Sequence, residues 1–220
     1  CMYGVEEAVE IAVDALCRLG HKRFGIPASA PFAGDLWFGD RIRLVRNALE
    51  KRSSSIRVFV EHEEEPYWKS VTGLLENQES ILDLIRNRRA QMRAEHPRAS
   101  RARLEELAAK TLAKDFPGLH RLCAERYCTA IIGINQWLAV CYYYWALGVG
   151  MDVPKELSIV GFDDMFVDSI HPVSTINFGL ENLAYRVAHL LIGDIPVGAD
   201  REGVIRSKPV LVDRGSLSEP

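Results

Sequence analysis

Apolar and polar residues follow one another along the chain in two rhythms, one typical of helices and one typical of buried strands. Over residues 4–19, apolar side chains recur every three or four positions and acidic ones avoid that face, which predicts an amphipathic helix stopped by Gly20. Residues 157–162 are almost entirely apolar, as expected of a parallel strand buried on both faces. Applied to the whole chain, these patterns predict strands and helices in alternation.

The predicted strands are separated by predicted helices almost throughout. The strands are expected at 22–26, 56–60, 128–134 and 157–162, with further extended segments at 174–177 and 204–212. The helices are expected at 40–52, 67–89, 136–147 and 180–192. This order predicts an α/β fold with a doubly wound parallel sheet and helices on both faces. Ligands of such sheets bind beyond the carboxyl ends of the strands.

The composition is that of a globular protein and narrows the function classes. Hydrophobic residues make up 48% of the 220 residues and charged residues 26%, and the net charge of −3 argues against a nucleic-acid binder overall. No apolar run is long enough to predict a membrane span. The five cysteines form no CxxC pair and the six histidines show no metal-ligand spacing, so we expect reduced thiols in a cytoplasmic protein without metal or cofactor.

The segment 86–126 has a charge balance of its own. It contains eleven Arg or Lys against five Asp or Glu, a net charge of +6, so the rest of the chain carries −9. Pro97 and Pro117 divide it into short helices, with Ser100 as a candidate cap. Arginine-rich helix faces are usually solvated surface, and the alternative is a docking surface for DNA or an acidic partner.

Several stretches of sequence resemble one known family. Residues 152–164 read DVPKELSIVGFDD, 129–135 read TAIIGIN, 171–176 read HPVSTI, 209–216 read PVLVDRGS and 19–23 read LGHKR. These are similar to motifs of the lactose-repressor (LacI/GalR) family of transcription regulators, and together they span almost the whole chain except 86–126.

The resemblance implies a periplasmic-binding-protein-like type I architecture, with two doubly wound lobes around a cleft. Residues 1–172 would form the second lobe of a sugar-sensing domain, interrupted by the basic helical insertion at about 86–126. Residues 173–200 would return toward the first lobe, and 201–220 would supply closing strands and a tail.

The resemblance also implies which residues grip the effector. They are Arg41, Trp68, Asn135, Gln136 and Phe178. An arginine fork suits neighbouring sugar oxygens, and an aromatic ring suits the C–H face of a sugar. Gln136 replaces the family's ligand-binding Asp and keeps hydrogen-bonding capacity without the charge.

Each of these residues has a plainer structural alternative. Arg41 could be a surface residue, with Arg43 or Arg46 as the reader, and Trp68 and Phe178 could be core residues. Asn135 and Gln136 could simply cap the following helix.

Residues 136–147 predict a helix that is apolar on every side and carries no charge. Such a helix must be covered on all sides. If the segment 86–126 does not cover it, a second copy of the chain is expected to do so, through Leu138, Tyr142, Trp145 and Ala146. The alternative is burial beneath the segment 86–126.

The leading functional hypothesis is therefore an effector-binding and dimerisation domain of a bacterial transcription regulator, and not an enzyme. The expected partners are a sugar-like small molecule, a second copy of the chain, and DNA through a domain outside this chain. One alternative is a sugar-binding protein of a transport system. Another is a hydrolase that uses the neighbouring carboxylates Asp163 and Asp164, although the resemblance implies that both are structural residues at a strand end that links the lobes.

Overall fold

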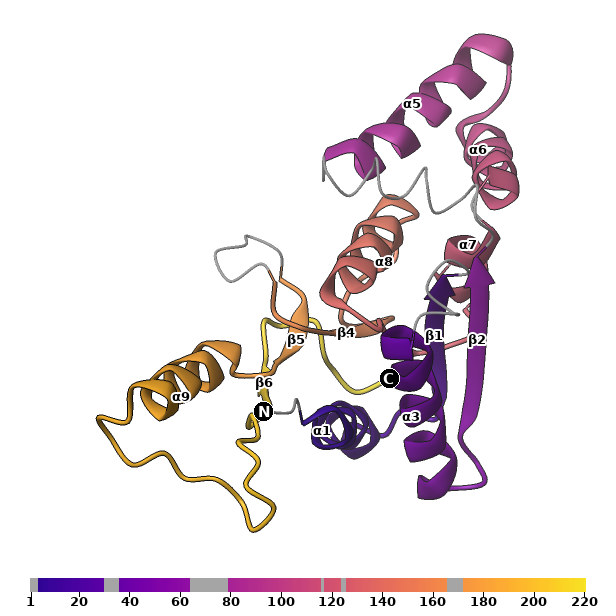
Figure 1. Cartoon of the computed structure of the whole chain (residues 1–220). Coiled ribbons are helices and arrows are strands. Elements are labelled where there is room, and N and C mark those ends of the chain that lie inside the picture. Colours follow the sequence, from indigo (N-terminus) through magenta and orange to yellow (C-terminus); the bar gives the residue numbers. More distant parts are fainter. Residues whose placement is uncertain (1–3, 30–35, 64–78, 116, 124–125, 166–171) are drawn as a thin grey trace.

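The computed structural model describes residues 4–29, 36–63, 79–115, 117–123, 126–165 and 172–220. Six strands form one sheet in the order β2-β1-β3-β4-β5-β6 (Figure 1). Their bounds are β1 Arg23–Ser29, β2 Arg57–Glu63, β3 Ala130–Ile132, β4 Ser158–Phe162, β5 Ser174–Asn177 and β6 Val210–Val212. The first five strands are parallel, and β6 is antiparallel to β5. The predicted parallel sheet is confirmed.

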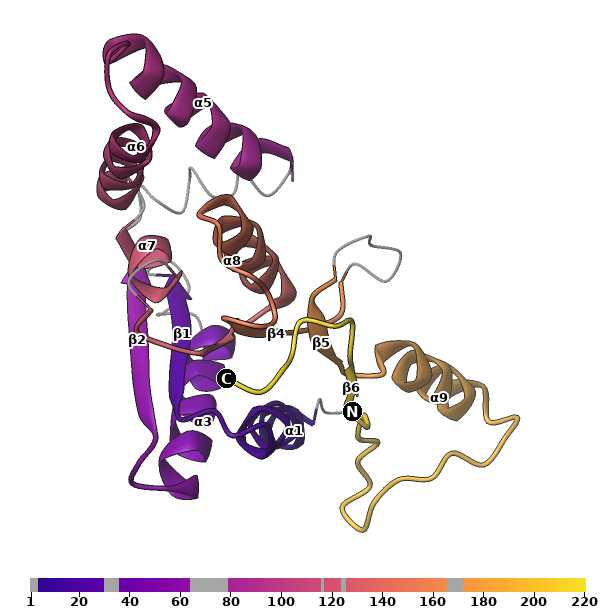
Figure 2. The ribbon, with the colours of Figure 1, turned by 180° about the vertical axis from the view of Figure 1, so that it is seen from behind.

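Helices lie on both faces of this sheet, also as predicted (Figures 1 and 2). Their bounds are α1 Val5–Arg18, α3 Leu36–Arg52, α5 Glu79–Glu95, α6 Arg101–Asp115, α7 Pro117–Cys123, α8 Gln136–Gly148 and α9 Leu180–Ile192. Helices α1 and α3 cover one face, and α7 and α8 cover the other. No described helix is both long and apolar enough to cross a membrane.

The basic segment folds as predicted into short helices separated at its prolines. Ser100 caps α6, since its side-chain oxygen accepts a hydrogen bond from the Arg103 amide at 3.3 Å. The helix expected at 67–89 differs: α5 continues to Glu95, and residues 64–78 lie outside the described part of the chain.

Two glycines let α8 approach the middle of the sheet. A Cβ at Gly161 of β4 would lie 2.9 Å from the Gln136 Cα and 2.9 Å from the Ala139 Cβ, and one at Gly133 would lie 2.8 Å from the Ala139 nitrogen. Most of these neighbours are backbone atoms, which cannot rotate away. The start of α8 is therefore pressed against the ends of β3 and β4.

We expect Gly161→Ala to lower the free energy of unfolding by about 1–3 kcal/mol, because the added methyl would push α8 off the sheet. Urea denaturation measures the loss. The matched control is Gly198→Ala, in a surface segment where the nearest atom to an added Cβ lies 4.0 Å away. Equal losses in both variants would contradict the close approach.

The apolar helix α8 is internal to the chain. Leu138, Tyr142, Trp145 and Ala146, expected at a dimer contact, are all at most 2% exposed. Part of the cover comes from the basic segment, since Arg89 of α5 donates to the Gly148 carbonyl at 3.1 Å and the Cys123 thiol of α7 lies 4.0 Å from the Tyr142 carbonyl. Ile85 of α5, just before this segment, is buried against Gly148. The expectation that these four residues face a second copy is therefore wrong, and the alternative of burial beneath the segment 86–126 holds.

A buried histidine ties the last residues of the chain to the sheet. His21 Nε2 lies 2.9 Å from the Ser218 carbonyl and 3.0 Å from Ser158 Oγ, and Nδ1 lies 2.9 Å from the Thr129 hydroxyl. A carbonyl can only accept, so Nε2 carries the proton in the neutral ring. Burial lowers the pKa of His21, although the Ser218 carbonyl opposes this shift.

The stability of the chain should therefore fall in mild acid. A lowered pKa means that the folded state favours the neutral ring, so the His21 contribution is complete above the unfolded pKa of about 6.5 and declines below it. One such group gives a slope of at most about 1.4 kcal/mol per pH unit. Urea midpoints between pH 8 and 5 would measure it. His21→Gln should flatten the curve, and an unchanged curve in that variant would contradict the assignment.

Four cysteines lie among the described residues, and none is in a disulfide. Burial raises the pKa of Cys128 to about 12 and also raises that of Cys123 and Cys141. These thiols stay protonated at neutral pH and behave as core side chains.

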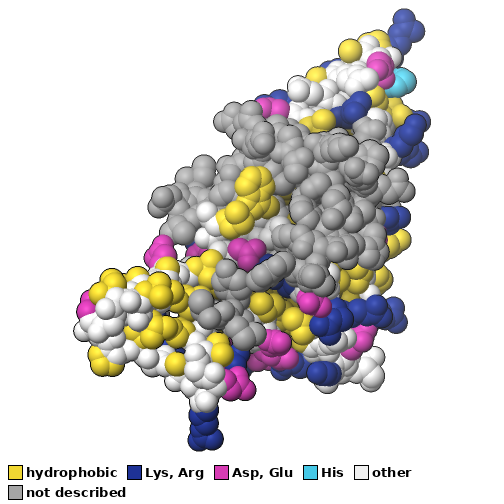
Figure 3. Space-filling view, viewed as in Figure 1, with side chains coloured by type: hydrophobic (Ala, Val, Ile, Leu, Met, Phe, Trp, Pro, Cys, Tyr) yellow, Lys and Arg dark blue, Asp and Glu magenta, His cyan; other side chains and the backbone are white. Residues whose placement is uncertain are grey.

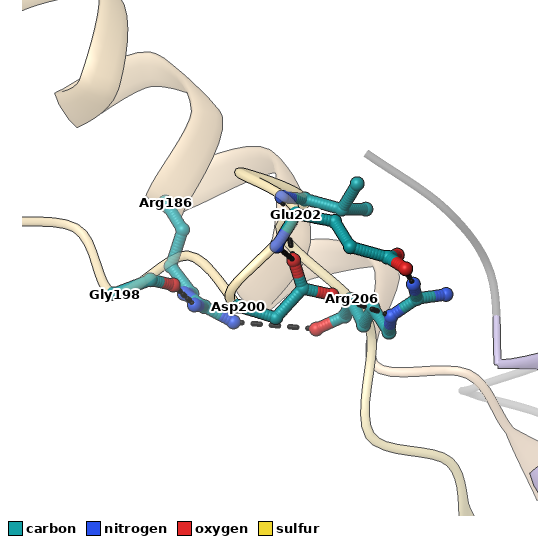
Figure 4. A network of polar contacts seen from close by, with 6 residues as sticks. Arg186, Gly198, Asp200, Glu202 and Arg206 are labelled. Atoms are coloured by element: carbon teal, nitrogen blue, oxygen red, sulfur yellow. Dashed lines mark hydrogen bonds and ion pairs between the residues drawn. The ribbon is translucent and has the colours of Figure 1, made fainter.

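The segment after α9 is folded on itself by polar contacts (Figure 4). Asp200 accepts hydrogen bonds from the amides of Glu202 and Val204, each at 2.9 Å, and from Arg206 Nε at 2.7 Å. The Val204 amide and the Arg206 guanidinium lower the pKa of Asp200. Arg186 of α9 reaches the carbonyls of Gly198 and Arg206, which connects this segment to the helix.

Candidate functional site

The candidate site centres on Arg41, which enters from α3 beside the carboxyl ends of β3 and β4. Its guanidinium makes a two-pronged ion pair with Asp163, with Nη1 and Nη2 each 3.0 Å from a carboxylate oxygen. Nη1 also donates to the Ile134 carbonyl, which follows β3. The Arg41 side chain is 8% exposed and that of Asp163 is 25% exposed. The carboxylate is therefore the more accessible half of the pair.

Two aromatic rings cover the guanidinium. The Arg41 Cζ lies 5.1 Å from the centre of the Phe162 ring and 5.3 Å from that of Phe178. Both distances are within the range of cation–π attraction. The rings fix the plane of the guanidinium, so its hydrogen bonds have a set direction.

The two carboxylates that follow β4 have different surroundings. Asp164 is 4% exposed and accepts hydrogen bonds from Arg214 at 2.7 Å and from Asn177 at 2.8 Å. Both aspartates have positive φ angles, 85° at Asp163 and 47° at Asp164. Non-glycine residues seldom adopt this conformation, and it turns the two side chains to separate partners. Asp164 joins β4 to the segments around β5 and β6, while Asp163 faces Arg41.

The structure brings only part of the predicted site together. Arg41 and Phe178 are in contact, and Asn135 follows directly on the Ile134 carbonyl that Arg41 binds. Asn135 also caps α8, because its side-chain oxygen accepts a hydrogen bond from the Leu138 amide at 2.8 Å. Gln136, the first residue of α8, is fully buried. Trp68 lies outside the described residues.

Arg43 and Arg46 are on the exposed side of α3. Arg43 pairs with Asp40 at 3.0 Å and Arg46 pairs with Glu50 at 2.7 Å. Such surface pairs on one helix contribute little to stability. Among the three arginines, Arg41 alone is held between rings and a carboxylate.

Sequence reasoning placed Asp163 among structural residues and so missed its contact with Arg41. Its position at the end of a buried strand was the available signal, because residues there line the ligand edge of such sheets. Together, Arg41 and Asp163 present donors and an acceptor side by side, with apolar ring faces adjacent. This arrangement suits a polar, uncharged molecule with neighbouring hydroxyl groups. No group of three or more metal-ligand side chains occurs in the described part of the chain.

Comparisons with known proteins agree with this architecture. A family model described as a periplasmic binding protein-like domain matches residues 13–217. A search of the curated proteins by sequence gave no match.

Solved structures with the same fold cover nearly the whole chain. A LacI-family transcriptional regulatory protein from Corynebacterium glutamicum is 17% identical, with a TM-score of 0.57 over 99% of this chain and 68% of its own. A dimeric Lac repressor is 17% identical, with a TM-score of 0.60 over 99% and 63%. A sugar-binding transcriptional regulator of the LacI family from Escherichia coli, complexed with phosphate, is 14% identical, with a TM-score of 0.62 over 100% and 63%. The chain spans about two thirds of the length of these proteins.

Proposed function

Because the chain belongs to the family of periplasmic binding protein-like domains, we propose that it is an effector-binding lobe of a bacterial transcription regulator. The effector is a sugar or a related polyol. The motifs of the lactose-repressor type and the shared fold of LacI-family regulators support this assignment. DNA is bound through a separate domain, and a second copy of the chain pairs with it, as in the dimeric Lac repressor.

The Arg41–Asp163 pair is the observation that carries the proposal. A sugar presents hydroxyls that both donate and accept, and a dry site needs partners for each of them. Asp163 supplies acceptors and Arg41 supplies donors, 3.0 Å apart and flanked by Phe178. An effector whose hydroxyls replace part of this ion pair binds one conformation of the site more tightly than the other. This difference in affinity is what allows a ligand to shift a regulator between two states.

Helix α9 has an exposed apolar surface that supports the presence of a first lobe beside this chain. Leu191 is 81% exposed and Ile192 is 69% exposed, and Tyr185 and Leu190 are also exposed. Figure 3 shows hydrophobic side chains gathered over this helix. Exposed apolar patches of this kind mark contact surfaces. We assign this one to the first lobe, in keeping with the return of residues 173–200.

The carboxylates do not favour the hydrolase alternative. Asp163 accepts from Arg41, and Asp164 from Arg214 and Asn177. This is the environment of a binding or structural carboxylate, whereas a hydrolase needs one carboxyl that gives and takes a proton. A sugar-binding protein of a transport system would have the same fold, so an experiment must distinguish it from a transcription regulator.

Arg41→Met should weaken sugar binding strongly. A panel of neutral sugars, polyols and sugar acids is screened by the thermal shift that each gives to the protein, and the affinity of the best ligand is measured by calorimetry. Loss of the guanidinium should weaken binding by at least about 2 kcal/mol, because its partners at the site stay unpaired. Arg43→Met, two residues further on the same helix, should bind normally. Equal affinity in both variants would remove Arg41 from the site.

Transcription separates the regulator from the transport protein. Deleting the gene should change the expression of neighbouring genes in a way that depends on the same sugar. A change in sugar uptake with unaltered transcription would instead support the transport protein.

A further inference from the structure

The pair of helices α5 and α6 has a groove that the proposed effector function does not use. Its volume is about 440 Å³. The lining residues are Arg89, Ala90 and Arg93 of α5, and Arg101, Leu104 and Glu105 of α6. Three arginines and Glu105 are the charged part of this lining, and Ala90 and Leu104 are the apolar part.

Two of the three arginines in the groove are available to a partner. Arg89 is engaged with Glu105 at 2.8 Å and with the Gly148 carbonyl at 3.1 Å. Arg93 and Arg101 are exposed, and within the described part of the chain neither has a carboxylate or hydrogen-bond partner. These two cations beside the apolar side chains of Ala90 and Leu104 favour a ligand that is both acidic and apolar.

The groove stands on a packed support. Met92, Leu104 and Ala108 form a small core between α5 and α6. Ile85 fixes the other part of α5 to the main core, beside Gly148 of α8. The helix pair projects from the sheet in Figure 1, and Lys and Arg side chains mark this end in Figure 3. The two helices that carry the cations are thus held at a set spacing.

The spacing of the cations fits a helix. Arg86, Arg89 and Arg93 lie at i, i+3 and i+7, so they form one row along α5, in which Arg86 pairs with Asp83 and Arg89 with Glu105. A partner helix with acidic residues on one side can pair with Arg93 and Arg101 while its apolar side meets Ala90 and Leu104, which is a recurrent mode of recognition.

The same residues disfavour a nucleic acid. Residues 79–115 contain no Phe, Trp or Tyr on which bases could stack. Inside the groove Glu105 is paired with Arg89, whereas Glu106 lies outside the groove lining and would repel the phosphates of a duplex that extends past the groove. We propose that the α5–α6 groove binds an acidic, amphipathic helix of another protein, which packs as a third helix against this pair.

A synthetic helical peptide tests the proposal with the whole chain. The probe is a fluorescein-labelled peptide of about five turns, with Glu at i, i+3 and i+7 beside a seam of Leu and Ala. Fluorescence anisotropy should show binding that weakens with salt, and a peptide with Gln in place of Glu should bind about ten-fold or more weakly.

The variant Arg93→Glu/Arg101→Glu should lose binding of the Glu peptide by about ten-fold or more. The matched control, Lys22→Glu/Lys114→Glu, makes the same change in net charge at exposed positions away from the groove and should bind normally. Circular dichroism checks that both variants are folded. Equal losses in the two variants, equal affinity for the Glu and Gln peptides, or no binding of the Glu peptide would each overturn the proposal. Tighter binding of a 20-base-pair duplex, lost in the groove variant, would overturn it in favour of a nucleic-acid surface.

Discussion

Replacing Tyr142 and Trp145 together by lysine should unfold the chain. Each side chain is 1% exposed in α8, so both new ammonium groups would be placed inside the hydrophobic core. Loss of one buried aromatic side chain costs about 3–5 kcal/mol, and burial of a charge adds to that cost. The sum for two sites approaches the whole stability of an average domain, about 5–15 kcal/mol. Far-ultraviolet circular dichroism and tryptophan fluorescence should show that the fold is lost.

The control for this prediction lies on the same helix. Leu147 is 39% exposed, so Leu147→Lys should leave the fold intact and change stability by less than about 0.5 kcal/mol. A double lysine variant that stayed folded and became monomeric would contradict the structure, because α8 would then be an interface between copies.

Asp164→Ala should destabilise the chain by about 3–5 kcal/mol. The substitution leaves Arg214, whose side chain is 17% exposed, without its carboxylate, and it removes the acceptor of the Asn177 amide. Breaking a buried ion pair by deleting one partner costs this much because the other charge stays buried. Urea denaturation at pH 7 measures the change.

Asp163→Ala is the matched comparison, because Asp163 is the neighbouring aspartate and also has a positive φ angle. Asp163 is 25% exposed, and without it Arg41 keeps the Ile134 carbonyl and its two ring contacts, so a smaller loss of stability is expected together with loss of effector binding. A larger stability loss at Asp163 than at Asp164 would reverse the roles that the geometry assigns to them.

The sheet was predictable because its signals are local. Each parallel strand is an apolar run of a few residues, and each run is followed by a helix with its own apolar face. The ends were less predictable: the strand expected at 128–134 is regular only over Ala130–Ile132, and the extended segment 204–212 forms a strand only over Val210–Val212. Strand ends depend on pairing with a neighbour, and the neighbour is distant in sequence.

The site was harder to predict because its contacts are not local. Arg41 and Asp163 are 122 residues apart, and no sequence pattern near either residue predicts that they form an ion pair. Gln136 follows a strand end, a position where ligand contacts are common in such sheets. However, Gly133 and Gly161 allow α8 to lie so close to the sheet that the Gln136 side chain is buried. The surroundings of α8 posed the same difficulty, since an apolar helix requires a cover without specifying which segment supplies it.

The fastening of the C-terminal tail has a consequence for how the chain folds during synthesis. The Ser216 carbonyl accepts a hydrogen bond from the Ile159 amide, and Ser218 accepts from His21, 197 residues earlier. Contacts between such distant residues form late and slowly. The middle of the sheet therefore lacks part of its hydrogen bonding until residue 218 has left the ribosome. A nascent chain halted shortly before that point should expose its central strands to proteases and chaperones that the finished chain resists.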